Sequence, residues 1–197
     1  MKKNFTGINP RSVQNVCSIG AGPIGAGWAA SFLAQGYKVS VYLHEASEED
    51  ALNDLIANAW SSLEALGLAN GASRDNLSCT TNLADAVKGA EFIQESVPEN
   101  LALKQKIYAQ LGELVPANVV IASSTSGLPM SEIQAHCSTP ERTVVGHPFN
   151  PPYLLPLVEI VRGEKTSDAA VKWLVEFYQI AGKAPLVLNK EIPGFIA

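Results

Sequence analysis

Charged residues and long apolar runs are both scarce in this chain of 197 residues. Charged residues make up 17% of the chain and hydrophobic residues 47%, a composition too apolar for disorder. No stretch approaches the roughly 18 apolar residues that a membrane span needs, and the N-terminus leads into no signal-peptide core. These shortages predict a globular cytoplasmic protein and argue against a membrane as its partner.

Basic residues and cysteines are also few. The chain has 14 Lys and Arg against 19 Asp and Glu, a formal net charge of −5, and no basic run, which argues against nucleic acid as a partner. Cys17, Cys79 and Cys137 are an odd, widely spaced set without a CxxC pair. They indicate buried thiols in a reducing compartment rather than a disulfide framework or a zinc site, and no metal is expected.

Short β-branched runs alternate with longer helical patterns along the chain, which is typical of a parallel sheet wrapped by helices. The patterns predict strands at 13–19, 37–43, 77–80, 91–94, 119–122, 143–147, 157–161 and 184–188. They predict helices at about 24–34, 46–66, 101–114 and 168–180. Because no repeat or linker interrupts them, we expect one α/β domain over residues 1–197, with a Rossmann-type, doubly wound, mostly parallel sheet.

A glycine-rich segment follows the first predicted strand and opens the first predicted helix. In the motif GxGxxG the first glycine permits a tight turn, the second admits a pyrophosphate and the third lets helix and strand pack closely. The helix N-terminus adds amide donors, and a proline suits its first turn. A purely structural turn is the alternative. The motif predicts a dinucleotide site formed by Gly20, Gly22, Pro23, Ile24 and Gly25.

The acidic residue that normally binds the adenosine ribose is missing from the end of the second predicted strand. Leu43 stands at that position and is followed by His44 and Glu45. Glu45 either reaches the ribose from a shifted turn or is an exposed glutamate that leads into the helix. No arginine lies nearby to bind a 2′-phosphate, so we expect NAD rather than NADP.

The segment VVGHPFNPPYLLPLVEIV contains the strongest catalytic pattern in the chain. His147 closes one predicted strand, Asn150 follows three residues later, and Glu159 lies within the next strand. A proline-rich crossing between two such strands suits a general base that is held by a buried carboxylate. A structural histidine at a strand end is the alternative. His44 and His136 have no comparable partner and are expected at the surface.

Five blocks give the chain a specific resemblance to a known family. They are, in order from about residue 16 to the last residue, GAGPIGAGWAASFLAQGYKVSVY, FIQESVPENLALK, SSTSGL, VGHPFNPPYLLPLVEIV and EIPGFIA. Together they resemble the NAD-binding domain of the 3-hydroxyacyl-CoA dehydrogenase superfamily, and most of all its branch that acts on small 3-hydroxy acids. The segment ANAWSSLEALGLANGA, residues 57–72, is similar to the carnitine-specific members of that branch.

The resemblance implies a role for each matching residue. His147 would remove the hydroxyl proton as hydride leaves for the nicotinamide, while Glu159 would orient His147 and stabilise its charged form. Ser126 would bind the substrate oxygen, and Asn150 would lie beside nicotinamide and substrate. Ser126 as a simple turn hydroxyl is the alternative.

The segment PENLALK carries two further positions that match cofactor contacts of the family, Glu99 and Lys104. The alternatives are an acid at a helix N-terminus for Glu99 and a solvated lysine for Lys104. No step of this chemistry needs a metal, and no metal-ligand spacing is evident in the sequence.

The substrate implied by the resemblance is L-carnitine, with L-gulonate and a 3-hydroxyacyl-CoA thioester as alternatives. Residues 46–67 hold five acids and no Lys or Arg, which disfavours the phosphates of coenzyme A, although such a run is also typical of a solvated helix face. Phe149 and Tyr153 are candidates for a trimethylammonium contact or for core packing. A nucleotide sensor or a crystallin-like structural protein is the alternative outside enzymes, and neither demands a His–Glu pair.

The resemblance implies that the family's C-terminal helical domain, which closes the substrate pocket and forms most of the dimer interface, is not part of these 197 residues. The resemblance therefore implies that a full-length form is a homodimer through that domain. We expect the chain alone to bind nucleotide but to turn substrate over slowly, because its pocket would lie open to water.

Overall fold

The computed structural model describes residues 5–192 and 194, so Pro193 and 195–197 of the EIPGFIA block lie outside the described residues. Its strands are β1 (Asn15–Ile19), β2 (Lys38–Tyr42), β3 (Leu77–Thr80), β4 (Phe92–Glu95), β5 (Val120–Ser123), β6 (Thr143–Pro148), β7 (Leu157–Val161) and β8 (Ala184–Leu188). Its α-helices are α1 (Pro23–Ala34), α2 (Glu48–Leu66), α3 (Leu83–Ala86), α4 (Leu101–Leu114), α5 (Met130–Ile133) and α6 (Asp168–Ile180). Short 3₁₀ helices are η1 (Pro10–Ser12), η2 (Arg74–Asn76), η3 (Gln134–His136) and η4 (Pro140–Arg142).

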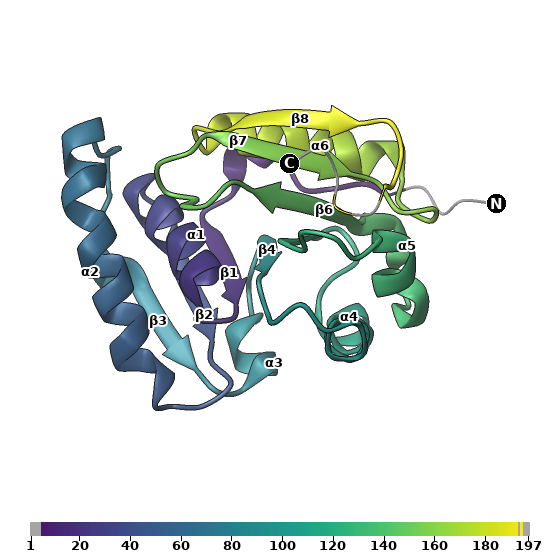
Figure 1. Ribbon diagram of the computed structural model, residues 1–197, viewed down its shortest axis with the longest axis horizontal. Helices are drawn as coiled ribbons and strands as arrows, with labels where there is room; N and C mark the ends of the chain where they lie inside the picture. Colours follow the sequence, from purple (N-terminus) through teal and green to yellow (C-terminus); the bar gives the residue numbers. More distant parts are fainter. Residues whose placement is uncertain (1–4, 193, 195–197) are drawn as a thin grey trace.

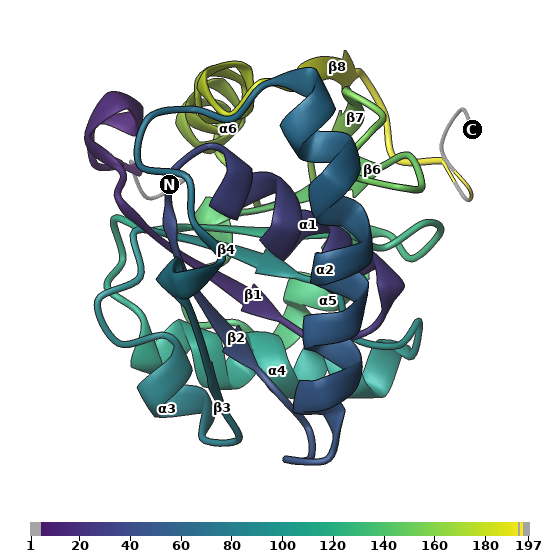
Figure 2. The ribbon, with the colours of Figure 1, turned by 90° about the vertical axis from the view of Figure 1, so that its left-hand side faces the viewer.

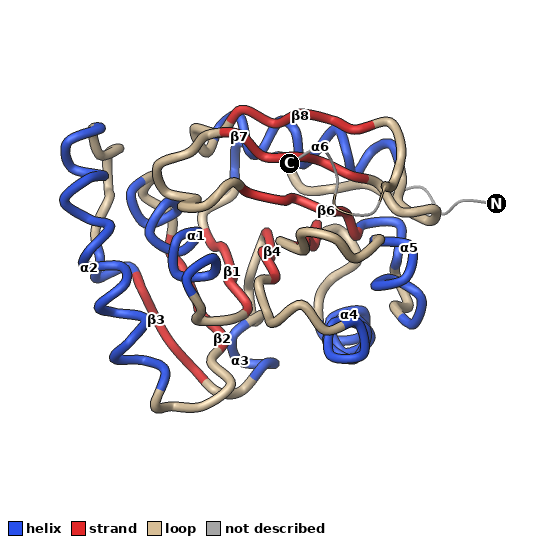
Figure 3. Tube along the Cα trace, in the orientation of Figure 1, coloured by secondary structure: helices blue, strands red, loops and turns tan. Residues whose placement is uncertain are grey.

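The strands form one eight-stranded sheet in the order β3-β2-β1-β4-β5-β6-β7-β8 (Figure 3). Neighbouring strands are parallel except β6 and β7, which are antiparallel. The predicted Rossmann-type, mostly parallel sheet is confirmed. The single antiparallel pair follows from the short proline-rich crossing, because a parallel return needs a longer connection.

Helices cover both faces of the sheet (Figure 1). One core lies between the sheet and α1, α2 and α6, and the other lies between the sheet and α3, α4 and α5. In Figure 2, α1 and α2 lie on the near side of the sheet and α4 on the far side. Because both faces are covered, β4 and β5 are buried along their whole length. Helix α1 is buried from Gly25 to Ala34, which explains its almost uniformly apolar sequence.

Several boundaries differ from those that the sequence predicts. Helix α2 begins at Glu48 rather than at residue 46, because the Glu48 carboxylate accepts the backbone N–H of His44 and holds the preceding turn. Leu55 of α2, three residues after the buried Leu52, is 37% exposed although it is apolar. Helices α3 and α5 were not predicted from the sequence, because four residues are too few to show a helical period.

The topology places a crevice at the carboxyl ends of β1 and β4. From β1 the chain first builds outward through β2 and β3, and it then returns to add β4 on the other side of β1. The connections after these two central strands therefore leave in opposite directions, and ligands of such sheets bind in the crevice between them. The glycine loop and the segments after β4, β5 and β6 all meet at this edge.

Candidate active site

A cavity of about 1110 Å³ lies at this edge of the sheet. It is larger than most ligand pockets, which run to roughly 1000 Å³. The residues that the sequence singled out and that line it are Gly20, Gly22, Pro23, Ile24, Glu99, Ser126, His147 and Asn150. The remaining four, Gly25, Glu45, Lys104 and Glu159, are not among its lining residues. The structure therefore brings most of the expected residues to one cavity and places the others around it.

The glycine loop has the geometry of a phosphate-binding turn. Gly20 has a φ of 105°, which favours glycine, and a Cβ on Gly25 would lie 2.0 Å from the Gly20 carbonyl oxygen. A Cβ on Gly22 would meet nothing within 4 Å, so this position is open to a ligand. Gly22 also caps α1 without a side-chain hydrogen bond, which leaves the first amides of the helix to an anion. The loop thus fits the pyrophosphate of a dinucleotide.

The end of β2 differs from the expected arrangement of acids. The Leu43 side chain is buried in the core rather than directed to the cavity. Glu45 is exposed, accepts the Ser47 hydroxyl and does not line the cavity. Glu48, one turn further on, does line it together with His44. Glu48 is therefore the acid that the fold places at this end of the cavity, and sequence spacing alone did not identify it.

His147 and Glu159 form a direct contact on neighbouring strands. The two residues are partners in the antiparallel register of β6 and β7, and His147 Nδ1 lies 2.7 Å from Glu159 Oε2. The Glu159 side chain is 1% exposed, whereas His147 lines the cavity and is 13% exposed. The Phe149 ring, also at the cavity, lies 6.0 Å from the imidazole. The carboxylate thus sits behind the imidazole and fixes its orientation.

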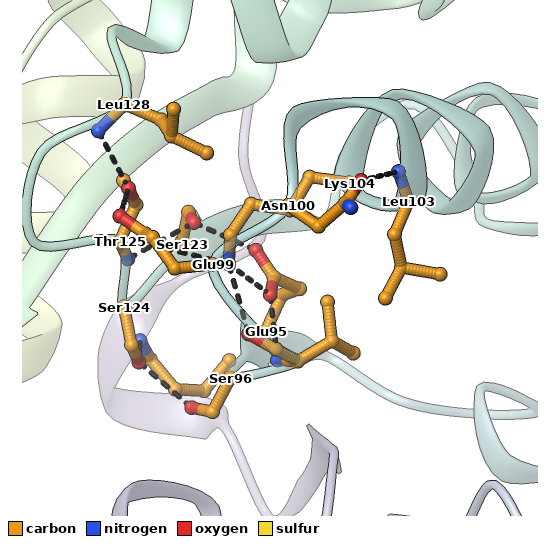
Figure 4. A network of polar contacts seen from close by, with 12 residues as sticks. Glu95, Ser96, Glu99, Asn100, Leu103, Lys104, Ser123, Ser124, Thr125 and Leu128 are labelled. Atoms are coloured by element: carbon orange, nitrogen blue, oxygen red, sulfur yellow. Dashed lines mark hydrogen bonds and ion pairs between the residues drawn. The ribbon is translucent and has the colours of Figure 1, made fainter.

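Glu99 holds the turn after β5 that carries Ser126, and Figure 4 shows Glu99 beside Thr125 of that turn. Its Oε1 accepts the Thr125 hydroxyl at 2.5 Å and the backbone N–H groups of Ser126 at 3.0 Å and Gly127 at 3.1 Å. Partial burial acts to raise the pKa of Glu99, but the Thr125 hydroxyl, the Lys104 charge and the two N–H groups outweigh it and lower that pKa below its ordinary value. An ionised Glu99 therefore ties the loop after β4 to the loop after β5.

Lys104 is buried beneath the site and is not a solvated lysine. Its side chain is 1% exposed, and Nζ lies 2.7 Å from Glu95 Oε1, 3.2 Å from the Val97 carbonyl and 3.6 Å from Glu99 Oε2. The other oxygen of the buried Glu95 accepts the Ser123 hydroxyl at 2.6 Å. The Lys104 ammonium donates to these groups and does not line the cavity itself. It acts on the cavity through its contact with Glu99.

Besides Glu48, sequence reasoning did not single out Gln94, Ser96 and Ser124, which lie at or behind the cavity wall. Ser96 and Ser124 line the cavity, and Gln94 is fully buried behind them. A signal for Gln94 and Ser96 exists in the sequence FIQES, because β4 is a central parallel strand, where apolar residues are the rule. Polar residues at the end of such a strand indicate a structured polar site.

Other side chains lie largely as the sequence predicts. His44 and His136 are exposed, and the acids of α2 other than Glu48 form an exposed face. Tyr153 packs against the core, so it is not a cavity residue as Phe149 is. All three cysteines are free, with Cys79 only half-buried.

Among the described residues, no group of three His, Cys, Asp or Glu side chains could hold a metal, and no helix is long and apolar enough to cross a membrane.

A glycine loop at a helix N-terminus, placed at the switch point of a doubly wound sheet, defines a dinucleotide-binding domain. Residues 15–192 match the family model described as 3-hydroxyacyl-CoA dehydrogenase, NAD binding domain. The chain belongs to this family, and its cofactor is NAD.

The relatives that this chain matches are longer than the chain itself. An L-carnitine dehydrogenase of Streptomyces coelicolor is 52% identical over 189 residues, which is 96% of this chain and 59% of that enzyme. An L-carnitine dehydrogenase of Streptomyces griseus is 52% identical over 95% of this chain and 56% of its own length. Among solved structures, an NAD⁺-dependent 5-formyl-3-hydroxy-2-methylpyridine 4-carboxylic acid 5-dehydrogenase is 34% identical, with a TM-score of 0.87 over 93% of this chain and 60% of its own. This chain thus spans about three fifths of these relatives.

Proposed function

We propose that the protein oxidises the 3-hydroxyl of L-carnitine to 3-dehydrocarnitine in an NAD-dependent reaction. The observation that carries the proposal is the His147–Glu159 contact at the wall of a cavity that the glycine loop also lines. The two Streptomyces relatives named L-carnitine dehydrogenase, each 52% identical to this chain, support the choice of substrate.

The proposed reaction removes one proton and one hydride from the secondary alcohol. NAD, when bound, supplies the acceptor for the hydride that leaves the carbon. Because the carboxylate of Glu159 holds Nδ1 of His147, we assign Nε2 as the base that takes the hydroxyl proton while the C–O bond becomes C=O. The buried charge of Glu159 then stabilises the imidazolium, and general-base catalysis of this kind contributes about 10² to 10⁴-fold.

Two cavity residues position the substrate in this proposal. Ser126 donates its hydroxyl hydrogen to the substrate oxygen, and Asn150 contacts the nicotinamide and the substrate from the loop after β6. Glu99 contacts the cofactor and holds Ser126 in place through the backbone of its turn. Lys104 keeps Glu99 ionised and acts on the cofactor through it.

The charge of α2 supports a small substrate over a CoA thioester. The helix begins with Glu48, Glu49 and Asp50 and contains no Lys or Arg over its length. A coenzyme A phosphate needs basic partners, which this face does not offer. Phe149 offers an aromatic face to a trimethylammonium group beside His147.

We place the cofactor domain and its catalytic pair within residues 1–197. A full-length form that carries the family's helical domain would assemble as a homodimer through it. The free cysteines support a reducing compartment, so we place the protein in the cytoplasm.

The test measures NADH formation with L-carnitine, L-gulonate and 3-hydroxybutyryl-CoA. Enzyme is used at a concentration comparable to that of NAD, so that even slow turnover is detected as NADH absorbance. We expect L-carnitine to give NADH and the other two substrates to give little or none. Oxidation of the CoA thioester alone would overturn the substrate assignment, and no NADH from any of them would overturn the proposed reaction.

His147→Gln tests the assignment of the base. We expect this variant to lose NADH formation and to bind NAD with unchanged affinity by calorimetry. His136→Gln is the matched control, because His136 is exposed and lies outside the cavity. Retained turnover in His147→Gln would remove the base assignment.

A further inference from the structure

A chain of hydrogen bonds runs from the core to the wall of the cavity. The buried Tyr178 hydroxyl lies 2.5 Å from Gln94 Oε1, and Gln94 Nε2 lies 2.8 Å from Ser124 Oγ. Ser124 Oγ also accepts a hydrogen bond from Trp28 Nε1 at 3.1 Å and lies 2.8 Å from Ser96 Oγ. Figure 4 shows the contact between the two serines at the ends of β4 and β5. Of these five hydrogen-bonded residues, Ser96 and Ser124 line the cavity.

The direction of these hydrogen bonds follows from groups that can only accept or only donate. The Gly146 carbonyl, 3.3 Å from Gln94 Nε2, can only accept, so it fixes the Gln94 amide with its NH₂ toward Gly146 and Ser124. The Trp28 indole N–H can only donate. Ser124 Oγ therefore accepts from both Gln94 and Trp28, and these two bonds occupy both lone pairs of its hydroxyl oxygen.

The hydrogen of Ser124 must then go to Ser96, which makes Ser96 the acceptor in the contact between them. Among residues 5–192 and 194, the structure gives the Ser96 hydroxyl no acceptor for its own hydrogen. Ser96 is half-buried at the cavity wall, beside the glycine loop, where a Cβ on Gly25 would lie 3.6 Å from Ser96 Cβ. The network thus presents the Ser96 hydroxyl to the cavity as a donor.

We propose that Ser96 is a cofactor-binding residue whose hydroxyl donates a hydrogen bond to an oxygen in the nicotinamide half of NAD. That oxygen belongs to the ribose or to the pyrophosphate, both of which can accept. Ser96 lies at the end of β4, on the side of the glycine loop that leads to Ser126 and His147. The adenosine end belongs on the other side, at the end of β2. The assignment rests on the NAD site of the proposed function.

The test is calorimetric titration of Ser96→Ala with AMP, ADP, ADP-ribose and NAD. We expect the Kd for NAD and ADP-ribose to rise about 3- to 10-fold, as for the loss of one hydrogen bond, and the Kd for AMP to stay unchanged. A matching loss for ADP identifies a phosphate oxygen as the acceptor, and an unchanged ADP affinity identifies the ribose. Ser61→Ala, on the exposed face of α2, is the matched control and should bind all four like wild type.

Ser124→Ala tests the proposed direction of the hydrogen bond between Ser124 and Ser96. Without the Ser124 hydrogen, the Ser96 hydroxyl is no longer directed, so we expect NAD to bind about 2-fold more weakly. The double variant should bind no more weakly than Ser96→Ala alone, because Ser124 acts through Ser96.

Unchanged NAD affinity in Ser96→Ala, an equal loss for AMP, or fully additive losses in the double variant would overturn the assignment. If wild type itself binds no NAD, the proposed function fails instead, and the two failures are thereby distinguished.

Discussion

His147 and Glu159 stand opposite each other in the antiparallel pair of β6 and β7, with Nδ1 2.7 Å from Oε2. This contact depends on the one reversal of direction in an otherwise parallel sheet. The reversal puts a buried carboxylate behind an imidazole that faces the cavity. Sheet topology, rather than a flexible loop, therefore sets the geometry of the proposed base.

Glu159→Gln should lower the rate of NADH formation by about 100-fold or more. The amide keeps the shape of the side chain but carries no charge to stabilise the imidazolium. NAD affinity should not change, because Glu159 does not line the cavity. Stopped-flow absorbance measures the rate, and calorimetry measures the Kd.

Glu164→Gln is the control for this substitution, because Glu164 is exposed. It should match wild type in both measurements. A Glu159→Gln variant with wild-type rates would show that the carboxylate only supports the fold.

Lys104→Met should lower the free energy of unfolding by about 3 kcal/mol, because it leaves a buried carboxylate unpaired. The Glu95 side chain is fully buried, and Lys104 lies 2.7 Å from it. Adding Glu95→Gln should recover part of the loss, since no buried charge then remains at the pair. Urea unfolding followed by tryptophan fluorescence measures both variants.

Lys172→Met, on the exposed face of α6, is the control and should change stability by less than about 0.5 kcal/mol. If Lys104→Met unfolds like this control, the buried pair contributes nothing to stability.

The sequence predicts the fold and the strands that carry His147 and Glu159 well because both depend on local patterns. Apolar runs of strand length, a glycine turn and a short proline-rich crossing are all visible within a few residues of each other. The His147–Glu159 contact is of this kind, because the partners are separated by 12 residues.

The polar network is not predictable in the same way. Ser96 and Ser124 meet across 28 residues, and Lys104 is buried against Glu95 and the loop after β4. Glu48 reaches the cavity because its carboxylate holds the turn before α2. Such contacts depend on how separate loops pack at the sheet edge, which no local pattern encodes.

Alanine at two positions of the glycine loop should affect different properties, NAD binding at one and stability at the other. Gly22→Ala should keep the free energy of unfolding within about 1 kcal/mol of wild type but raise the Kd for NAD at least about 10-fold, because its methyl group occupies open space that the pyrophosphate needs. Gly25→Ala should cost about 2 kcal/mol of stability or more, because its methyl group would lie 2.0 Å from the Gly20 carbonyl oxygen.

Urea unfolding and calorimetry on both variants separate the two roles. NAD binding by Gly22→Ala as tight as that of wild type would show that the cofactor does not approach this loop.

Lys183 links the turn before β8 to the loop after β6. Its ammonium donates to the Pro152 carbonyl and lies 5.4 Å from the centroid of the Trp28 ring. Pro152 in turn packs on α1, where a Cβ on Gly27 would lie 2.7 Å from its ring. Burial lowers the pKa of Lys183 from 10.5 to about 8.

This lowered pKa predicts a pH dependence of stability that Lys183→Met removes. Between about pH 8 and pH 10.5 the unfolded chain binds the Lys183 proton and the folded chain does not, so the free energy of unfolding rises with pH through that window. Wild type should therefore gain about 2 kcal/mol relative to Lys183→Met between about pH 7 and pH 10, as measured by urea unfolding. The exposed Lys165→Met should follow wild type at both pH values. A constant difference between wild type and Lys183→Met would mean that Lys183 titrates alike in the folded and unfolded chain, and its ammonium would then hold the Pro152 loop without an electrostatic cost.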